Sequence, residues 1–301
     1  MWPRQSGKWF DLSELLGTHA LLPFNKIEGF NYLETTNYQG TLFRFPLRNR
    51  PSDLSRSTHD AKTIIKLTAV LRDEAKFLLL FLRSVHTVVL SSITSKGICN
   101  ELFHVQVTPD CQGKLTKQRT KLKTKVSDIH KSSPYRISPC ISCVSRFSIE
   151  LKDTINQQSR TMPWLIASRV GSTNVEVLKT SEQQETFPWV GVAMQLDEHS
   201  ASDGRVFCFL PMPVEASSNL PVHVNGTFGL NDDRRTIKWP GGERRNDPTA
   251  HWNQILVKDC LPTCYSLLLK NAVRDNLITS CLLYTSPSPR DATLSRMPSS
   301  A

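Results

Sequence analysis

The sequence has no apolar run long enough to cross a membrane. The nearest candidate, Phe77 to Leu82, is short and is flanked by Lys76 and Arg83, whereas a membrane-spanning helix needs about 20 consecutive apolar residues. The first residues of the chain are largely polar and lack the apolar core of a secretory leader. We therefore expect a cytoplasmic location and no membrane partner.

The sequence also lacks the short motifs that hold phosphate groups or a catalytic nucleophile. It contains neither Gly-x-x-x-x-Gly-Lys-Ser/Thr nor Gly-x-Gly-x-x-Gly, the two glycine-rich turns that commonly bind nucleotide phosphates. The Gly-x-Ser-x-Gly turn that exposes a nucleophilic serine is missing as well. We expect no enzyme activity and no catalytic residue in this chain.

Eight cysteines are spread along the 301 residues, which, without a secretory leader, favours reduced thiols over a disulfide framework. Cys140 with Cys143, and Cys260 with Cys264, have a spacing that is typical of zinc ligands. Residues three apart on a strand point to opposite faces, however, and the second pair lies on a helical pattern interrupted by Pro262. We therefore favour packing cysteines and expect no metal site.

The formal net charge of +10 raises the question of nucleic-acid binding, since basic faces bind phosphate by releasing counterions. Much of this charge lies in one short segment that has almost no aromatic residue to stack on a base: Lys114, Lys117, Arg119, Lys121, Lys123 and Lys125. The pattern favours a solvated loop, and we expect a long basic insertion near residues 108–139. A basic nucleic-acid-binding module is kept as an alternative.

Hydrophobic periodicity predicts helices and one strand in the first part of the chain. Helical spacing of apolar residues predicts a helix that stops at Gly17 and another over Ala61 to Ala75. Alternation with period two predicts a strand over Gly40 to Arg48. The apolar runs Phe77 to Leu82 and Val85 to Ile93 are expected to pack inside.

From residue 96 onward, short runs rich in β-branched and aromatic residues predict strands. They are Leu102 to Val107, Ser142 to Leu151, Trp164 to Val170, Trp189 to Leu196 and Arg205 to Leu210. A helical pattern returns at Asp247 and is interrupted at Pro262, and we expect the core to end near Asn276. Together these elements predict an α+β fold.

The last residues do not read like a folded protein. Cys281 to Ala301 resembles one reading frame of a sequencing adapter. Pro287, Pro289 and Pro298 remove backbone donors, and serine and threonine dominate without apolar periodicity. We expect residues 277–301 to be a disordered, non-native tail.

Five blocks of the sequence carry a resemblance to a known family. They are Gly40 to Arg48 (Gly-Thr-Leu-Phe-Arg-Phe-Pro-Leu-Arg), Phe77 to Val85, Phe207 to Pro213, Leu220 to Phe228, and Asp233 to Trp239 followed by Trp252-Asn253. In this order they resemble the large internal repeats of the sacsin family, which are related to the GHKL ATPases and so to the ninety-kilodalton heat-shock chaperones. The resemblance implies a truncated GHKL-like sheet in residues 1–95. It also implies a mixed β/α middle segment in residues 96–276, rich in strands and ending in helices.

The resemblance also bears on nucleotide binding. In the family, the residues that hold magnesium, activate water and bind adenine precede the block Gly40 to Arg48, and residues 1–39 contain no such motifs. Thr41 alone matches a family position, near the adenine side of the pocket. We therefore expect a vestigial nucleotide contact at Thr41 and no cofactor for this chain, with ATP and magnesium left to the intact parent.

The family resemblance implies that the chain is part of a chaperone or co-chaperone involved in protein folding and quality control. Chaperone machinery and client proteins would then bind through the intact parent. The alternatives are an ATP-binding chaperone domain completed by other repeats and the nucleic-acid-binding module. Because the upstream helices of the family are missing, we also expect Phe43, Phe45 or Leu47 to be exposed.

Overall fold

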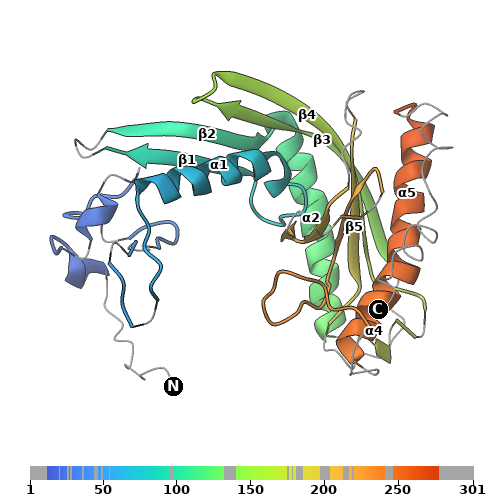
Figure 1. Cartoon of the computed structure of the whole chain (residues 1–301). Helices are drawn as coiled ribbons and strands as arrows, with labels where there is room; N and C mark the ends of the chain where they lie inside the picture. Colours follow the sequence, from blue (N-terminus) through green and yellow to red (C-terminus); the bar gives the residue numbers. More distant parts are fainter. Residues whose placement is uncertain are drawn as a thin grey trace. The chain divides into compact units, whose positions relative to one another are not determined.

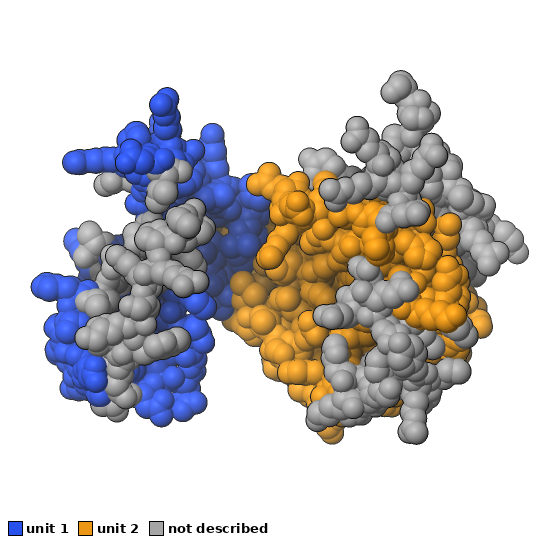
Figure 2. Space-filling model, turned by 90° about the horizontal axis from the view of Figure 1, so that it is seen from below, with its two compact units in different colours: residues 1–71, 89–103 blue, residues 72–88, 104–301 orange. Residues whose placement is uncertain are grey.

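Two compact units make up the computed structural model of the chain (Figure 1, Figure 2). Residues 1–71 and 89–103 form unit 1, and residues 72–88 and 104–301 form unit 2. The structure describes residues 12–19, 21–25, 27, 29–35, 37–43, 47–48, 50–53, 55–94, 96, 98–131, 140–174, 176–177, 179–180, 186–196, 204–212, 217–218, 220–240 and 247–277. The predicted tail therefore lies outside the described residues, apart from Leu277.

Unit 1 begins, in its described part, with two short 3-10 helices, η1 (Leu12–Leu15) and η2 (Leu22–Phe24). Gly17 follows η1 with a φ of +73°, a left-handed conformation that glycine adopts without steric cost. The predicted helix stop is thus confirmed. Phe30 packs edge to face against Phe24 and Tyr38, with ring centroids 6.1 and 5.7 Å away, and these rings give the unit a small aromatic core.

The helix α1 (Ala61–Leu78) begins in unit 1 and ends in unit 2. Asp60 caps its start, because the Asp60 carboxylate accepts hydrogen bonds from the hydroxyl and the backbone N–H of Thr63, at 2.7 and 2.8 Å. These bonds lower the pKa of Asp60. The predicted helix over Ala61 to Ala75 is therefore confirmed, and it continues into the apolar run that follows.

Within the described residues, eight strands form one sheet in the order β1-β2-β3-β4-β5-β8-β6-β7. They are β1 (Thr87–Ile93), β2 (Cys99–Val107), β3 (Ile141–Asp153), β4 (Gln158–Val170), β5 (Trp189–Gln195), β6 (Val206–Cys208), β7 (Leu210–Pro211) and β8 (His223–Gly226). The pairs β3/β4, β4/β5, β5/β8 and β6/β7 are antiparallel, and β6 pairs parallel with β8. Every run predicted as a strand after residue 96 contributes to this sheet, and the predicted mixture of helices and strands is confirmed.

Helices cover both faces of the sheet in unit 2. Side chains alternate along a strand, so Leu165 and Ala167 of β4 pack with the C-terminal helices, whereas Val170 packs with Leu122 and Val126 of α2 (Pro109–Lys131). In Figure 1, α2 and α5 (Leu261–Arg274) lie on opposite sides of these strands. Among the described helices, none is both long enough and apolar enough to cross a membrane.

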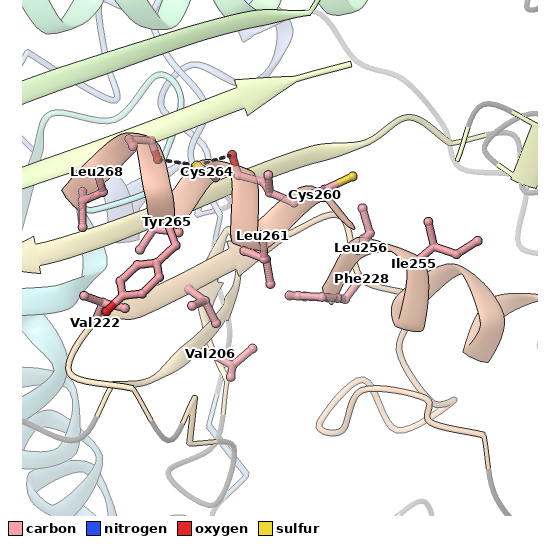
Figure 3. Packing of buried hydrophobic residues seen from close by; sticks show 14 of the residues in the cluster. Val206, Val222, Phe228, Ile255, Leu256, Cys260, Leu261, Cys264, Tyr265 and Leu268 are labelled. Atoms are coloured by element: carbon pink, nitrogen blue, oxygen red, sulfur yellow. Dashed lines mark hydrogen bonds between the residues drawn. The ribbon is translucent and has the colours of Figure 1, made fainter. Parts of the chain in front are cut away.

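The C-terminal layer is one uninterrupted helical rod. The helix α4 (Pro248–Ile255) runs through a π-helical turn, η3 (Leu256–Cys260), directly into α5. The predicted interruption at Pro262 is wrong, because Pro262 lies in the first turn of α5, where the missing N–H is tolerated, and the wide π turn before it shifts the hydrogen-bond register. Figure 3 shows Tyr265 of this rod beside Val222 in the buried cluster.

Residues 109–131 form the helix α2, so the prediction of a basic loop is wrong for this part of 108–139. Residues 132–139 lie outside the described residues. The sequence of α2 is mostly polar but contains a narrow stripe of apolar residues. Its members are seven and four positions apart, which places their side chains on one face of the helix. Its three members are buried: Leu115, Leu122 and Val126.

The block Gly40 to Arg48 does not form the predicted strand in its described part. Residues 40–43 and 47–48 belong to no strand, and residues 44–46 lie outside the described residues. A strand needs a partner along its whole length, whereas the described part of this block has only isolated backbone bonds, such as the one from the His59 N–H to the Arg48 carbonyl at 2.7 Å. Phe43 is 73% exposed and Leu47 is 54% exposed, which confirms the expected exposure, whereas Phe45 is not described.

The two predicted apolar runs, Phe77 to Leu82 and Val85 to Ile93, differ in their burial. Phe77, Leu79 and Phe81 are buried, as predicted, but they lie on the end of α1 and in the turn after it. The prediction that Val85 to Ile93 packs inside is wrong, since Val89 and other alternate residues of β1 are exposed. β1 is the first strand in the sheet order and pairs on one side only, which explains its exposure.

We predict that Leu122→Ala destabilises the chain by about 2–4 kcal/mol, because it removes a buried side chain between α2 and the sheet. The matched variant Lys123→Ala lies on the exposed side of the same helix and should change the free energy of unfolding by less than about 0.5 kcal/mol. Urea denaturation measures both. Equal effects of the two variants would show that residues 109–131 are not packed on the sheet.

Candidate functional site

Thr41, the single predicted nucleotide contact, lies exposed in unit 1, outside every helix and strand. Its side chain makes no hydrogen bond to another described residue. Within the described part of the chain, no group of three or more His, Cys, Asp or Glu side chains is placed to hold a metal ion. The described residues therefore add no second member to a nucleotide site, and the vestigial role of Thr41 stays a prediction.

The two cysteine pairs consist of free thiols. Burial raises the pKa of Cys260 and of Cys264 to about 12, and Cys264 Sγ donates a hydrogen bond to the Ala167 carbonyl at 3.3 Å (Figure 3). Cys140 and Cys143 are half-buried, and burial raises the pKa of Cys143 to about 11. Zinc binds thiolates, which form most readily where the pKa is lowered. Cys260 and Cys264 are thus packing residues of the core.

Polar and aromatic side chains converge where residues 72–88 lie on the sheet of unit 2. We call residues 72–88 the docking segment. Phe77 packs edge-on against Trp164 at 6.4 Å between centroids, and Phe81 packs against Phe207 at 4.9 Å. Gly191 of β5 leaves room for this contact, because a Cβ at that position would lie 3.0 Å from the Phe81 ring. The segment therefore rests directly on β4, β5 and β6.

Two arginines join the docking segment to the rest of unit 2, one from within the segment and one from α2. Arg72 lies 3.4 Å from the buried carboxylate of Asp153, the last residue of β3. Arg119 of α2 donates hydrogen bonds to the carbonyls of Leu79 and Val85, at 2.9 and 3.3 Å. Burial lowers the pKa of Arg119 to about 10, so the guanidinium stays charged at neutral pH. It thereby gives hydrogen bonds to two carbonyls of the chain that follows the end of α1 at Leu78.

Arg83 lies against two aromatic rings. Its guanidinium is 4.4 Å from the centroid of Phe209 and 4.9 Å from that of Trp189, a cation–π geometry that is favourable by about 1 kcal/mol. Phe209 has a φ of +64°, which costs energy for a bulky residue. Its backbone N–H donates to Asn225 Oδ1 at 2.7 Å, and this bond holds the strained conformation in place.

Arg205, which is half-buried, and His223, which is buried, form a polar node next to the docking segment. The Arg205 guanidinium pairs with Glu74, and the Arg205 backbone N–H donates to His223 Nδ1 at 3.0 Å. Since Nδ1 accepts, the ring proton is assigned to Nε2. His223 is 2% exposed, with the Phe77 ring centroid at 4.9 Å. Burial, together with the positive charges of Arg205 and Lys76, lowers the pKa of His223 to about 4.

The enclosed His223 is suited to folding and not to chemistry on an external substrate. A general base must come within hydrogen-bonding distance of the proton that it takes, and almost no surface of this imidazole is accessible. Its neutral form is the one that fits beside Arg205. We therefore assign the node a positioning role, which is to hold Glu74 and Phe77 of the docking segment against β6 and β8.

A second buried cluster fixes the loop between β8 and α4. The Asn253 side chain accepts from the Gly229 N–H at 2.8 Å and donates to the carbonyls of Gly229 and Lys238, at 2.8 and 2.7 Å. Trp252 Nε1 donates to the Thr227 carbonyl at 2.8 Å. A Cβ on Gly229 would lie 2.0 Å from a side chain of α4, so the close approach requires glycine. Asn253 of the C-terminal rod is thus hydrogen-bonded to the block Asp233 to Trp239, through the Lys238 carbonyl.

Sequence patterns indicate the apolar members of these clusters but not their polar members. Arg119 lies in the segment predicted as a loop, and the contacts of Arg205 join residues far apart in the chain. One signal points to His223, which stands inside an apolar run between Val222 and Val224. A lone histidine in such a run is more often buried than exposed.

We predict that protonation of His223 weakens folding. Its pKa is about 4 in the folded chain, against an ordinary value of 6.5, so the unfolded chain takes up the proton first as pH falls. The stability from neutral His223 is complete above about pH 6.5 and is lost toward pH 4, by about 3 kcal/mol in total. Urea denaturation across this range should show the loss. His223→Gln should remove it, whereas His251→Gln, at an exposed histidine, should keep it; identical profiles for all three proteins would contradict the prediction.

We predict that Asn253→Ala destabilises the chain by about 2–4 kcal/mol, since it removes three hydrogen bonds of a fully buried side chain, to the Gly229 N–H and to the carbonyls of Gly229 and Lys238; the Gly229 carbonyl keeps only its bond from the Lys238 N–H at 3.1 Å. Asn271→Ala is the matched control, because that side chain makes a single bond to a carbonyl of its own helix, and we expect a cost below about 1 kcal/mol. Chemical denaturation compares them. A cost for Asn253→Ala no larger than for Asn271→Ala would exclude the proposed clamp.

Comparisons with known proteins agree with the resemblance carried by the five blocks. Residues 12–103 match the Sacsin domain family. Human sacsin is 33% identical over 255 residues, which cover 79% of this chain and 6% of the human protein. No solved structure matches the chain. The domain match and the similarity to the human protein together identify the chain as a member of the sacsin family.

Proposed function

We propose that this chain is a non-catalytic segment of a chaperone or co-chaperone that acts in protein folding and quality control. The observation that carries the proposal is the 33% identity to human sacsin across 79% of the chain. Because the chain spans 6% of the length of that relative, the activity, clients and partners of a longer protein belong to the proposal. Chaperone machinery and client proteins would bind through that longer protein.

The proposal includes a GHKL-type origin for residues 1–95. Its support is the block Gly40 to Arg48, which lies inside the match to the Sacsin domain at residues 12–103. Nucleotide chemistry in such a domain needs magnesium ligands and donors for the phosphates, and Thr41 alone supplies neither. We therefore assign ATP and magnesium to the longer protein, or to a site that its other repeats complete.

Exposed apolar side chains in unit 1 support a role in binding other polypeptides. Phe43, Ile65 and Val70 are 73%, 66% and 62% exposed. Exposed apolar patches on soluble proteins commonly mark contact surfaces, and unfolded clients present apolar segments that would match them. These side chains are the ones we propose to contact clients.

A basic nucleic-acid-binding module is the second candidate, because α2 presents a stripe of lysines. Lys114, Lys117 and Lys121 are exposed, and their spacing of three and four positions places them on one helix face. However, α2 contains no Phe, Tyr or Trp, and binding of single strands depends on aromatic stacking. We therefore place this candidate below the chaperone role.

We predict that the full chain binds no nucleotide but slows the aggregation of an unfolding protein. Calorimetric titration with ATP and Mg²⁺ should give no binding heat, because the described residues place no group of metal ligands and no hydrogen-bond partner beside Thr41. Light scattering from a heat-unfolded reporter enzyme should rise more slowly with the chain present. Phe43→Ser should weaken this protection, and Thr58→Ala, at an exposed polar position of the same unit, should not.

The two measurements separate the competing functions. A saturable nucleotide isotherm would favour an ATP-binding domain over the scaffold proposed here. Unchanged light scattering in the presence of the chain would contradict the chaperone role.

A further inference from the structure

An open groove in unit 2 lies between α5 and the strands β3 and β4. It encloses about 430 Å³, and the lining residues that matter here are Ser142, Arg169, Thr263, Ser266, Leu267 and Lys270. It lies away from the docking segment, on the face of the sheet that α5 covers.

The groove is built from two regular rows of side chains. Ser142 and Arg169 are partners in the antiparallel ladder of β3 and β4, so both side chains leave the sheet on the same face. Thr263, Ser266 and Lys270 follow one another on α5 at intervals of three and four, which places them on one side of the helix. The groove is thus fixed by a strand pair and a helix.

Four polar side chains of the groove can donate hydrogen bonds but have no acceptor among the described residues. Neither Arg169 nor Lys270 forms an ion pair with another described residue, and the hydroxyls of Ser142 and Ser266 make no hydrogen bond within the described part of the chain. Thr263 differs, because its hydroxyl donates to the Asp259 carbonyl at 3.0 Å. No described Asp or Glu lines the groove. Two positive charges and two hydroxyls therefore face the same space.

We propose that this groove binds a phosphate monoester, either as a free small molecule or on a phosphorylated side chain. A phosphate monoester carries nearly two negative charges and three acceptor oxygens at neutral pH, which match Arg169 and Lys270 in charge. The guanidinium of Arg169 can give two parallel hydrogen bonds to such a group, and Lys270 gives a point charge. Leu267 provides an apolar wall for the carbon part of the ester.

The test is a ³¹P NMR titration of the full chain with inorganic phosphate, glycerol phosphate and a short phosphoserine peptide at low salt. We expect saturable binding with a Kd of about 1 mM. Lys270→Gln should weaken it at least about tenfold, the effect of losing one charged hydrogen bond. Lys258→Gln, at an exposed lysine of the same helical rod but outside the groove, should leave it unchanged.

The three ligands distinguish the sources of the phosphate. Similar Kd values for all three would identify a site for free phosphate esters, and clearly tighter binding of the peptide would identify a site for phosphorylated side chains; both outcomes support the proposal. Absence of saturable binding up to about 10 mM, or equal weakening by Lys258→Gln, would overturn it. Arg169→Gln gives a second, independent variant, and its melting temperature checks that it folds.

Discussion

The burial of arginine charge is the constraint on which unit 2 depends. A guanidinium removed from water must find acceptors or aromatic faces for its N–H groups. Arg119 donates hydrogen bonds to the carbonyls of Leu79 and Val85, and Arg205 forms an ion pair with the carboxylate of Glu74. All three acceptors belong to the docking segment, so its departure would take away most of the partners of two half-buried cations; Arg205 would keep the Met212 carbonyl, at 3.1 Å. Breaking such a pair costs far more than the intact pair contributes, and the segment and the sheet are therefore expected to fold as one.

The short strand β8 couples the two layers that cover the sheet. Val222, just before it, and Val224 within it pack into the cluster beneath the C-terminal rod. On the other face, His223 contacts Phe77 of the docking segment, and Asn225 holds the backbone of Phe209. Four residues of one strand, all buried, thus connect the polar node to the apolar core. Successive side chains of β8 point into different layers. A structural change in one layer is therefore expected to alter the packing of the other.

Sequence patterns predict the strands of unit 2 well, because a half-buried strand shows its alternation directly. They miss α2, since Leu115, Leu122 and Val126 are its only fully buried apolar side chains among the described residues and many lysines and threonines separate them. The prediction of a strand over Gly40 to Arg48 is wrong for the opposite reason. The period-two alternation of its residues is clear, but a strand also needs a partner strand, which cannot be recognised from the local sequence. The contacts of the polar node cannot be predicted from local sequence patterns, because Glu74 and Arg205 are far apart in the sequence and meet only in the folded chain.

Four of the five blocks that resemble the sacsin family, the second to the fifth, contact one another within unit 2. Phe77 of the second block lies 4.9 Å from His223 of the fourth, and Phe81 lies at the same distance from Phe207 of the third. Asn253 binds the carbonyl of Lys238 within the fifth. Packing restrains apolar and hydrogen-bonding residues over long stretches, whereas catalysis restrains a few polar residues around an accessible cleft. The contacts among the second to fifth blocks are of the first kind, and packing of this kind does not depend on whether a nucleotide site lies elsewhere in a longer protein.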